Sequence, residues 1–236
     1  MKSVNQLDLC RSYLRSAAGD LKSARSGKRQ DGPVVTISRA AGARGDSIAE
    51  VLVGMLANMP EIPQHHPWTL FNQNLIQQVI DEHDLPAGTQ QYFPEDSAGE
   101  FRSMIAEMLG LHPGVFTSVR KTAETIRRIA KAGNAIIVGR GGNLITTDIP
   151  HSVHVRLVGS EKARIRHYAR RFEMTESHAA AEIARLDHAR KAYIKSHFAA
   201  DIEDPTLYDL IINTDRFSNQ AAARLIARAL AERTAA

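Results

Sequence analysis

Cysteine is almost absent from this sequence. The one cysteine among 236 residues, Cys10, cannot form an internal disulfide, and no histidine or cysteine stands near it at the spacing of metal ligands. Long apolar runs are also missing, because none approaches the roughly 20 residues needed to cross a bilayer. The first six residues lack the apolar core of a signal peptide. We therefore expect a cytoplasmic protein without a membrane partner.

The excess of basic residues is confined to one segment. The chain has a net charge of +4, and residues 1–32 carry all of it, with seven Lys or Arg against three Asp. The remainder holds 23 basic and 23 acidic residues and is neutral. We expect a basic N-terminal leader and linker at 1–32, followed by one domain at 33–236. Nucleic acid is not an expected partner of that domain, although docking of the leader to nucleic acid or an acidic partner stays a weaker alternative.

Strand-like and helix-like segments alternate along the domain. Short apolar or β-branched runs predict strands at 33–38, 68–71, 135–138, 153–158 and 208–213. A helix with period 3.6 follows the first strand, and further helices are predicted at 72–83, 98–110, 115–132, 160–172, 175–199 and 218–233, with Ser160, Thr175 and Ser218 as N-caps. This alternation predicts an α/β fold, a mostly parallel sheet covered by helices on both faces.

The loop after the first strand is the first candidate binding site, because open parallel sheets bind ligands at the carboxyl ends of their strands. Residues 38–47 read Ser-Arg-Ala-Ala-Gly-Ala-Arg-Gly-Asp-Ser. Gly42 and Gly45 let successive backbone N–H groups turn toward a phosphate at the positive end of the next helix. The alternative is an ordinary strand-to-helix turn with solvated arginines.

Residues 36–49 resemble the Ile-Ser-Arg-x-x-Gly-x-Gly-Gly-x-x-Ile-Ala segment of cytidylate kinase-like proteins, P-loop relatives of the nucleoside monophosphate kinases. The resemblance spans about residues 33–230 and implies a P-loop NTPase-type fold with a helical lid. It also implies ATP and Mg²⁺ as cofactors, with Ser47 at the hydroxyl position that binds the metal. The implied donor-nucleotide residues are Ser38, Arg39, Gly42, Arg44, Gly45, Asp46 and Ser47.

The loop departs from the full P-loop pattern at the position that matters most for charge. The lysine that reaches the β- and γ-phosphates falls on Gly45, and the two outer glycines of the pattern become Arg39 and Arg44. Asp46 adds a carboxylate where phosphate would bind. On the functional interpretation, Arg39 or Arg44 supplies the missing positive charge.

Further motifs match the acceptor side of the family. Arg140 follows a predicted strand within Gly-Arg-Gly and falls on the arginine that holds the monophosphate substrate. Asp187 and Arg190 match an Asp-x-x-Arg motif that contacts the substrate nucleotide, although a simple intrahelical ion pair explains the same spacing. Asn72 stands where an Asp is usual. The resemblance thus implies Asn72, Arg140, Asp187 and Arg190 as substrate-binding residues.

Five cations crowd residues 161–171, namely Lys162, Arg164, Arg166, Arg170 and Arg171. Such crowding is typical of a lid that neutralises charge during phosphoryl transfer, and Arg166 and Arg170 lie one helical turn apart. We expect these two to be the catalytic arginines. The alternative is a solvated basic helix.

These features favour an ATP-dependent phosphotransferase acting on a nucleoside monophosphate of the CMP type, or on a related small acceptor. A catalytically weak or inactive pseudokinase that binds a nucleotide as a ligand sensor is the alternative, favoured by the absent lysine and by Asp46. The sequence leaves open whether the protein forms a homo-oligomer.

Overall fold

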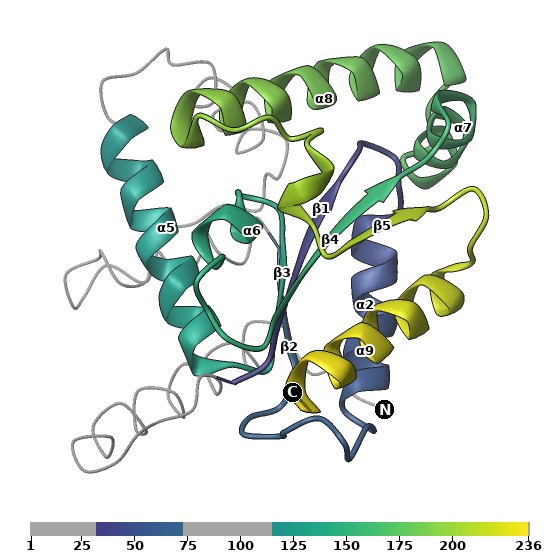
Figure 1. Cartoon of the computed structure of the whole chain (residues 1–236). Helices are drawn as coiled ribbons and strands as arrows, with labels where there is room; N and C mark the ends of the chain where they lie inside the picture. The colour runs from purple at the N-terminus through teal and green to yellow at the C-terminus, as the bar shows by residue number, and fades with distance from the viewer. Residues whose placement is uncertain (1–31, 73–114, 236) are drawn as a thin grey trace, which may run out of the picture.

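A parallel five-stranded sheet forms the centre of the computed structural model, which describes residues 32–72 and 115–235. The strands stand in the order β2-β3-β1-β4-β5 (Figure 1). Their bounds are β1 Val34–Arg39, β2 Thr69–Phe71, β3 Ala135–Val138, β4 Ser152–Val158 and β5 Leu210–Asn213. Because β1 is central and pairs with β3 and β4, the loops that follow these three strands leave the sheet side by side.

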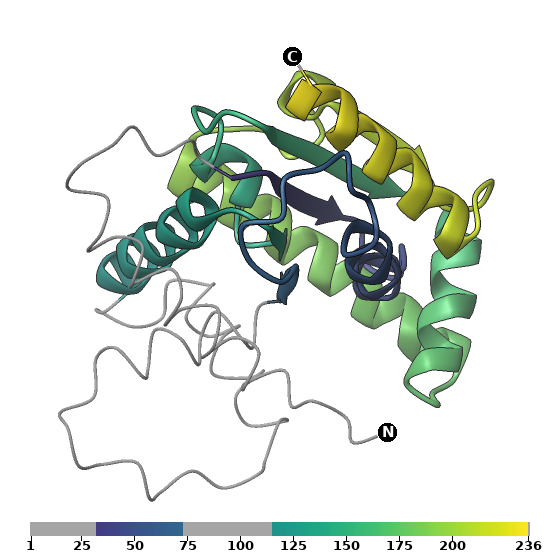
Figure 2. The same cartoon turned by 90° about the horizontal axis from the view of Figure 1, so that it is seen from below.

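Helices cover both faces of the sheet, so the predicted P-loop type of α/β fold is confirmed. The helices are α2 Gly45–Leu56, α5 Val115–Ala132, α6 Gly142–Ile145, α7 Glu161–Arg171, α8 Glu176–Phe198 and α9 Asn219–Ala235, with a 3₁₀ turn at Pro205–Leu207. Side chains alternate along β1, so Val35 packs with α2 and α9 while Val34 packs with α5 on the other face. Figure 2 shows α5 and α9 on opposite sides of the strands.

Helices α7 and α8 form an arm over the carboxyl ends of the strands (Figure 1). Ile183 and Leu186 of α8 pack on Ala41 of the loop after β1, together with Ile165 and Tyr168 of α7. The arm therefore lies against the candidate phosphate loop, as a lid would.

The predicted N-caps are confirmed. The hydroxyls of Ser160, Thr175 and Ser218 accept the N–H of the residue three positions ahead at the start of α7, α8 and α9. The predicted helices 72–83 and 98–110 and residues 1–31 of the leader lie outside the described residues. In the part of the chain that the structure describes, no helix is long and apolar enough to cross a bilayer.

Candidate phosphate-binding site

The loop between β1 and α2 has the backbone of an anion-binding turn. Gly42 adopts φ 76°, and a Cβ there would lie 2.5 Å from the carbonyl oxygen of Arg164. Arg44, the N-cap of α2, is also left-handed with φ 60°. The N–H groups of the first turn of α2 have no partner within the helix, so they are available at its positive end.

The side chain of Arg44 is directed to the far side of the loop. It donates to the carbonyl oxygens of Thr214 and Phe217, the latter at 2.6 Å, and to Oδ1 of Asn219 at 2.9 Å. The guanidinium therefore ties the loop to the connection between β5 and α9.

Asp46 and Ser47 lie in the first turn of α2 and face Arg171 of α7. Nη1 of Arg171 donates to Oγ of Ser47 at 3.1 Å, and its Nη2 lies 3.9 Å from Oδ2 of Asp46. Arg171 therefore offsets the negative charge that Asp46 brings to the loop. The Ser47 hydroxyl and the Asp46 carboxylate are oxygen donors of the kind that Mg²⁺ prefers, so the donor set suits the expected metal.

Asp187 of α8 connects the lid to the loop. Its Oδ1 accepts the N–H of Ala41 at 2.7 Å, and its Oδ2 accepts from Nη1 of Arg164 at 2.6 Å. Arg164 in turn donates to the carbonyl oxygen of Ala41 at 2.9 Å. Arg190 lies 3.9 Å from Asp187 and donates to the carbonyl oxygen of Arg39 at 3.3 Å. The Asp187–Arg190 pair is thus part of a contact between α8 and the loop, not an isolated intrahelical pair.

Arg140 lies in a left-handed turn at the end of β3. Residues 139–141 all have positive φ, with 56° at Arg140. Arg140 hydrogen-bonds the hydroxyl of Tyr193 on α8; burial raises the pKa of this tyrosine, and the arginine opposes that rise. The turn places Arg140 beside Tyr193 of α8, and its contact with a monophosphate substrate stays a prediction.

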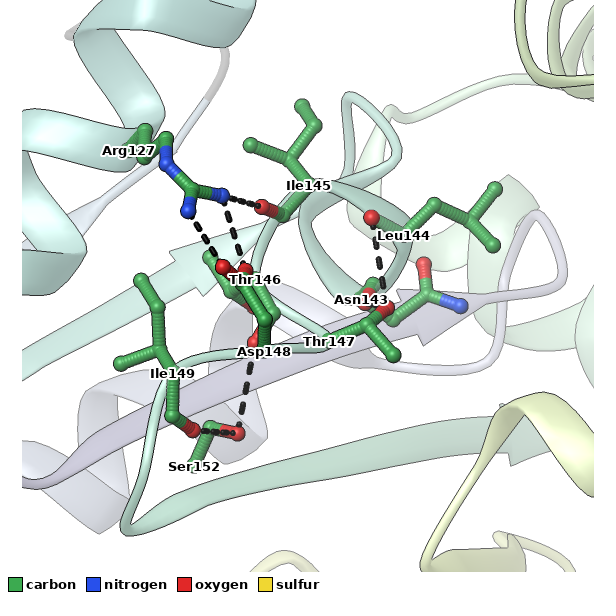
Figure 3. Close-up of polar contacts among 9 residues, drawn as sticks. All are labelled: Arg127, Asn143, Leu144, Ile145, Thr146, Thr147, Asp148, Ile149 and Ser152. Carbon is green, nitrogen blue, oxygen red and sulfur yellow. Dashed lines mark hydrogen bonds and ion pairs between the residues drawn. The ribbon is translucent and has the colours of Figure 1, made fainter.

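A polar clamp supports the segment after Arg140 (Figure 3). Arg127 of α5 donates to both carboxylate oxygens of Asp148 and to the carbonyl oxygen of Ile145 at 3.2 Å. The Thr147 hydroxyl donates to the carbonyl oxygen of Asn143 at 2.8 Å. These bonds fix α6 against α5, so the turn that holds Arg140 rests on an ordered support.

Two cavities lie on either side of the end of β1. One, of about 270 Å³, lies over the loop and is lined by residues 39–46 with Asn72, His167 and Arg171. The other, of about 50 Å³, lies at Arg140 and Tyr193. Arg39 and Arg190 line both cavities. The cavity over the loop is therefore the larger of these two, and Arg39 and Arg190 lie between it and the cavity at Arg140.

A buried arginine of β4, which the sequence analysis does not single out, adds to this positive region. Arg156 is only 9% exposed, donates to Oγ of Ser38 at 3.1 Å, and lies 5.7 Å from the centre of the Tyr208 ring. Burial lowers the pKa of Arg190. Burial and the positive charge of Arg190 lower the pKa of Arg39 to about 9. An arginine within an apolar strand is the signal that sequence inspection could use.

The predicted lid arginines lie apart from these cavities. Arg166 and Arg170 are exposed, whereas Arg164 and Arg171 contact the loop and the start of α2. His167 also lines the loop cavity. Its pKa is lowered mainly by burial and, to a smaller extent, by the positive charge of Arg44. The structure therefore brings together Ser38, Arg39, residues 42–47, Asn72, Arg140, Asp187 and Arg190, but not Arg166 or Arg170.

Comparison with known proteins gives one family. The model of the cytidylate kinase-like family matches residues 34–216. An uncharacterized protein from Eubacterium ventriosum has a similar structure, with a TM-score of 0.61 at 18% identity over 84% of this chain and 98% of that one. Shikimate kinase from Bacteroides thetaiotaomicron aligns at 12% identity over 85% of this chain and 95% of that one, with a TM-score of 0.44. No curated protein matches the chain.

Proposed function

The chain belongs to the cytidylate kinase-like family, and from this premise we propose that it transfers the γ-phosphoryl group of ATP to a nucleoside monophosphate of the CMP type or to a related small phosphorylated acceptor. The observation that carries the proposal is the pair of cavities that share Arg39 and Arg190. One cavity faces the phosphate loop and the other faces Arg140. Donor and acceptor phosphates bound in them would meet at the end of β1.

The loop side suits the donor. Backbone N–H groups of residues 42–47 would bind the phosphates at the positive end of α2. Ser47 and Asp46 would hold Mg²⁺, which when bound neutralises charge on the donor phosphates. Arg171 now contacts both residues, so it would turn from them to the nucleotide when the metal binds.

The acceptor side suits an anion. Arg140 and Arg190 would bind the acceptor phosphate. Asn72 lines the loop cavity and Asp187 contacts the loop, so either residue would contact the substrate only where it extends past the end of β1. In the transfer, an acceptor phosphate oxygen forms a bond to the γ-phosphorus, the bond to the β-phosphate oxygen breaks, and ADP leaves with that electron pair. Such chemistry depends on positioning and positive charge, so it requires no nucleophile from the protein.

On α7, Arg171 already faces the loop and is our first candidate for stabilising charge during transfer. A catalytic role for Arg166 and Arg170 remains a proposal, and it requires α7 to turn about its axis when nucleotide binds.

The experiment is a transfer assay with ATP·Mg²⁺ and a panel of nucleoside monophosphates and small phosphorylated acceptors, with products separated by chromatography. A matched pair of glycine variants, one in the loop and one outside it, tests whether turnover depends on the loop. Gly42→Ala places a Cβ against the Arg164 carbonyl and should abolish turnover, whereas Gly54→Ala on α2 meets nothing within 4 Å and should keep it. The proposal fails if no acceptor yields a phosphorylated product with the wild-type protein.

A nucleotide-binding sensor without turnover is the second candidate. Two observations favour it: position 45 lacks a lysine, and the Asp187 carboxylate already occupies the Ala41 N–H of the loop. Saturable binding of ATP in calorimetry, combined with no product from any acceptor, would select this function.

A further inference from the structure

Arg39 occupies the space that a loop lysine would use. Its side chain leaves the end of β1 and lies over Gly45, where a Cβ would stand 3.0 Å from Cγ of Arg39. The guanidinium reaches the end of β3, where a Cβ on Gly139 would collide with Nη1. Glycine at both positions therefore makes room for the Arg39 side chain.

The charge of Arg39 is poorly compensated. Within residues 32–72 and 115–235, no hydrogen bond or ion pair to its guanidinium is found, and the nearby cations Arg190 and Arg140 add to its charge. Asp46 and Asp187 only partly oppose them. Because an arginine keeps its proton in proteins, a bound anion would offset the positive charge that Arg39, Arg140 and Arg190 bring to this site.

The other cation of the loop is not available for this role. The Arg44 guanidinium is tied to Thr214, Phe217 and Asn219 on the far side of the loop. Position 45 carries no side chain, and one introduced there would press on Arg39. Arg39 is thus the loop cation that lines both cavities.

We propose that Arg39 replaces the missing loop lysine as the residue that binds the transferred phosphoryl group, reaching it from the end of β1 between the donor and acceptor cavities. This inference rests on the proposed function and deepens it. A guanidinium offers a planar fork of donors, so it can contact oxygens of the donor and the acceptor phosphate at once, whereas a lysine offers a single compact ammonium group.

The test compares Arg39→Met and Arg39→Lys with Arg228→Met, a control on α9 whose side chain is 72% exposed. The probe is inorganic tripolyphosphate with Mg²⁺, titrated by calorimetry, and each variant is also melted. We expect Arg39→Met to weaken binding roughly 10- to 100-fold, Arg39→Lys to bind with intermediate affinity, and Arg228→Met to bind as the wild type does.

Melting separates binding from a structural role. Since the Arg39 guanidinium makes no hydrogen bond or ion pair with the described residues and lies near Arg190 and Arg140, Arg39→Met should melt at or above the wild-type temperature while it loses affinity, whereas loss of a structural arginine would lower both. Wild-type affinity in Arg39→Met, or no tripolyphosphate binding by the wild-type protein, overturns the inference. Binding that depends on Arg39 without transfer to any acceptor would refute the transferase proposal alone and leave the phosphate contact of Arg39 supported.

A rescue variant gives a second, independent result. Gly45→Lys alone should bind tripolyphosphate poorly, because the new side chain meets Arg39. The double variant Arg39→Gly with Gly45→Lys recreates the common lysine arrangement and should recover affinity. If the double variant binds no better than Arg39→Gly, a lysine and Arg39 do not serve the same role, and the inference is overturned.

Discussion

Replacing Arg44 should destabilise the protein, and the size of the effect follows from its contacts. The side chain donates three hydrogen bonds, to Thr214, Phe217 and Asn219. A hydrogen bond from a charged donor is worth about 1.5–3 kcal/mol, and bonds on one partly solvated group are not additive. We therefore expect Arg44→Ala to lower the free energy of unfolding by about 3 kcal/mol.

The backbone of Arg44 provides an internal control. Its φ of 60° is left-handed, which costs a non-glycine residue about 1 kcal/mol. Arg44→Gly loses the same three bonds but relieves this strain, so it should lose only about 2 kcal/mol. For a chain of this size, 1 kcal/mol shifts the melting temperature by about 2–4 °C. Thermal melting followed by circular dichroism should therefore rank wild type above Arg44→Gly, and Arg44→Gly above Arg44→Ala.

Two results would refute this reasoning. An Arg44→Ala protein that melts with the wild type would show that the connection between the loop and α9 contributes nothing to stability. An Arg44→Gly protein that melts below Arg44→Ala would show that the left-handed conformation is not strained.

The contact of Asp187 with the loop and a half-buried histidine, His154, give two further predictions. Asp187→Asn keeps an oxygen for the Ala41 N–H but loses the ion pair with Arg164, so urea denaturation should show a loss of about 1 kcal/mol, against about 2–3 kcal/mol for Asp187→Ala; equal losses would contradict this. Burial lowers the pKa of His154, against the opposing effect of Asp209. Because the folded-state pKa lies below the unfolded value of about 6.5, stability should be full above that pH and fall as the pH drops through it toward the folded value. His154→Gln should show a smaller loss between pH 7 and 5 than the wild type, and parallel profiles would exclude His154 as the cause.

The fold is predictable from the sequence because its signals are local. Strands β1, β3 and β4 carry buried Val, Ile and Leu in continuous or alternating runs, and they match the predicted ranges to within one residue at each end. The N-cap hydroxyls mark the starts of α7, α8 and α9. Helix α6 is not predicted, since one turn of helix after consecutive glycines carries no periodic pattern.

The site is less predictable because its decisive contacts join distant residues. The partners of Arg44 lie about 170 positions away, and Asp187 lies 146 positions from Ala41, so no local pattern reveals them. The face of α7 is different, because Ile165, Tyr168 and Ala169 follow a helical period and mark the inward side. That period places Arg166 and Arg170 on the opposite side, a signal available in the sequence.

The central claim is that the loop between β1 and α2 binds the phosphates of a nucleotide, and glycine amides report on it directly. With [¹⁵N]glycine labelling, titration with ATP·Mg²⁺ should shift the N–H signals of Gly42 and Gly45 in a saturable manner, while Gly54, on α2 and outside both cavities, stays in place. Adenosine, which lacks phosphates, should leave Gly42 and Gly45 unmoved. Unchanged Gly42 and Gly45 signals at saturating ATP·Mg²⁺ would contradict the account.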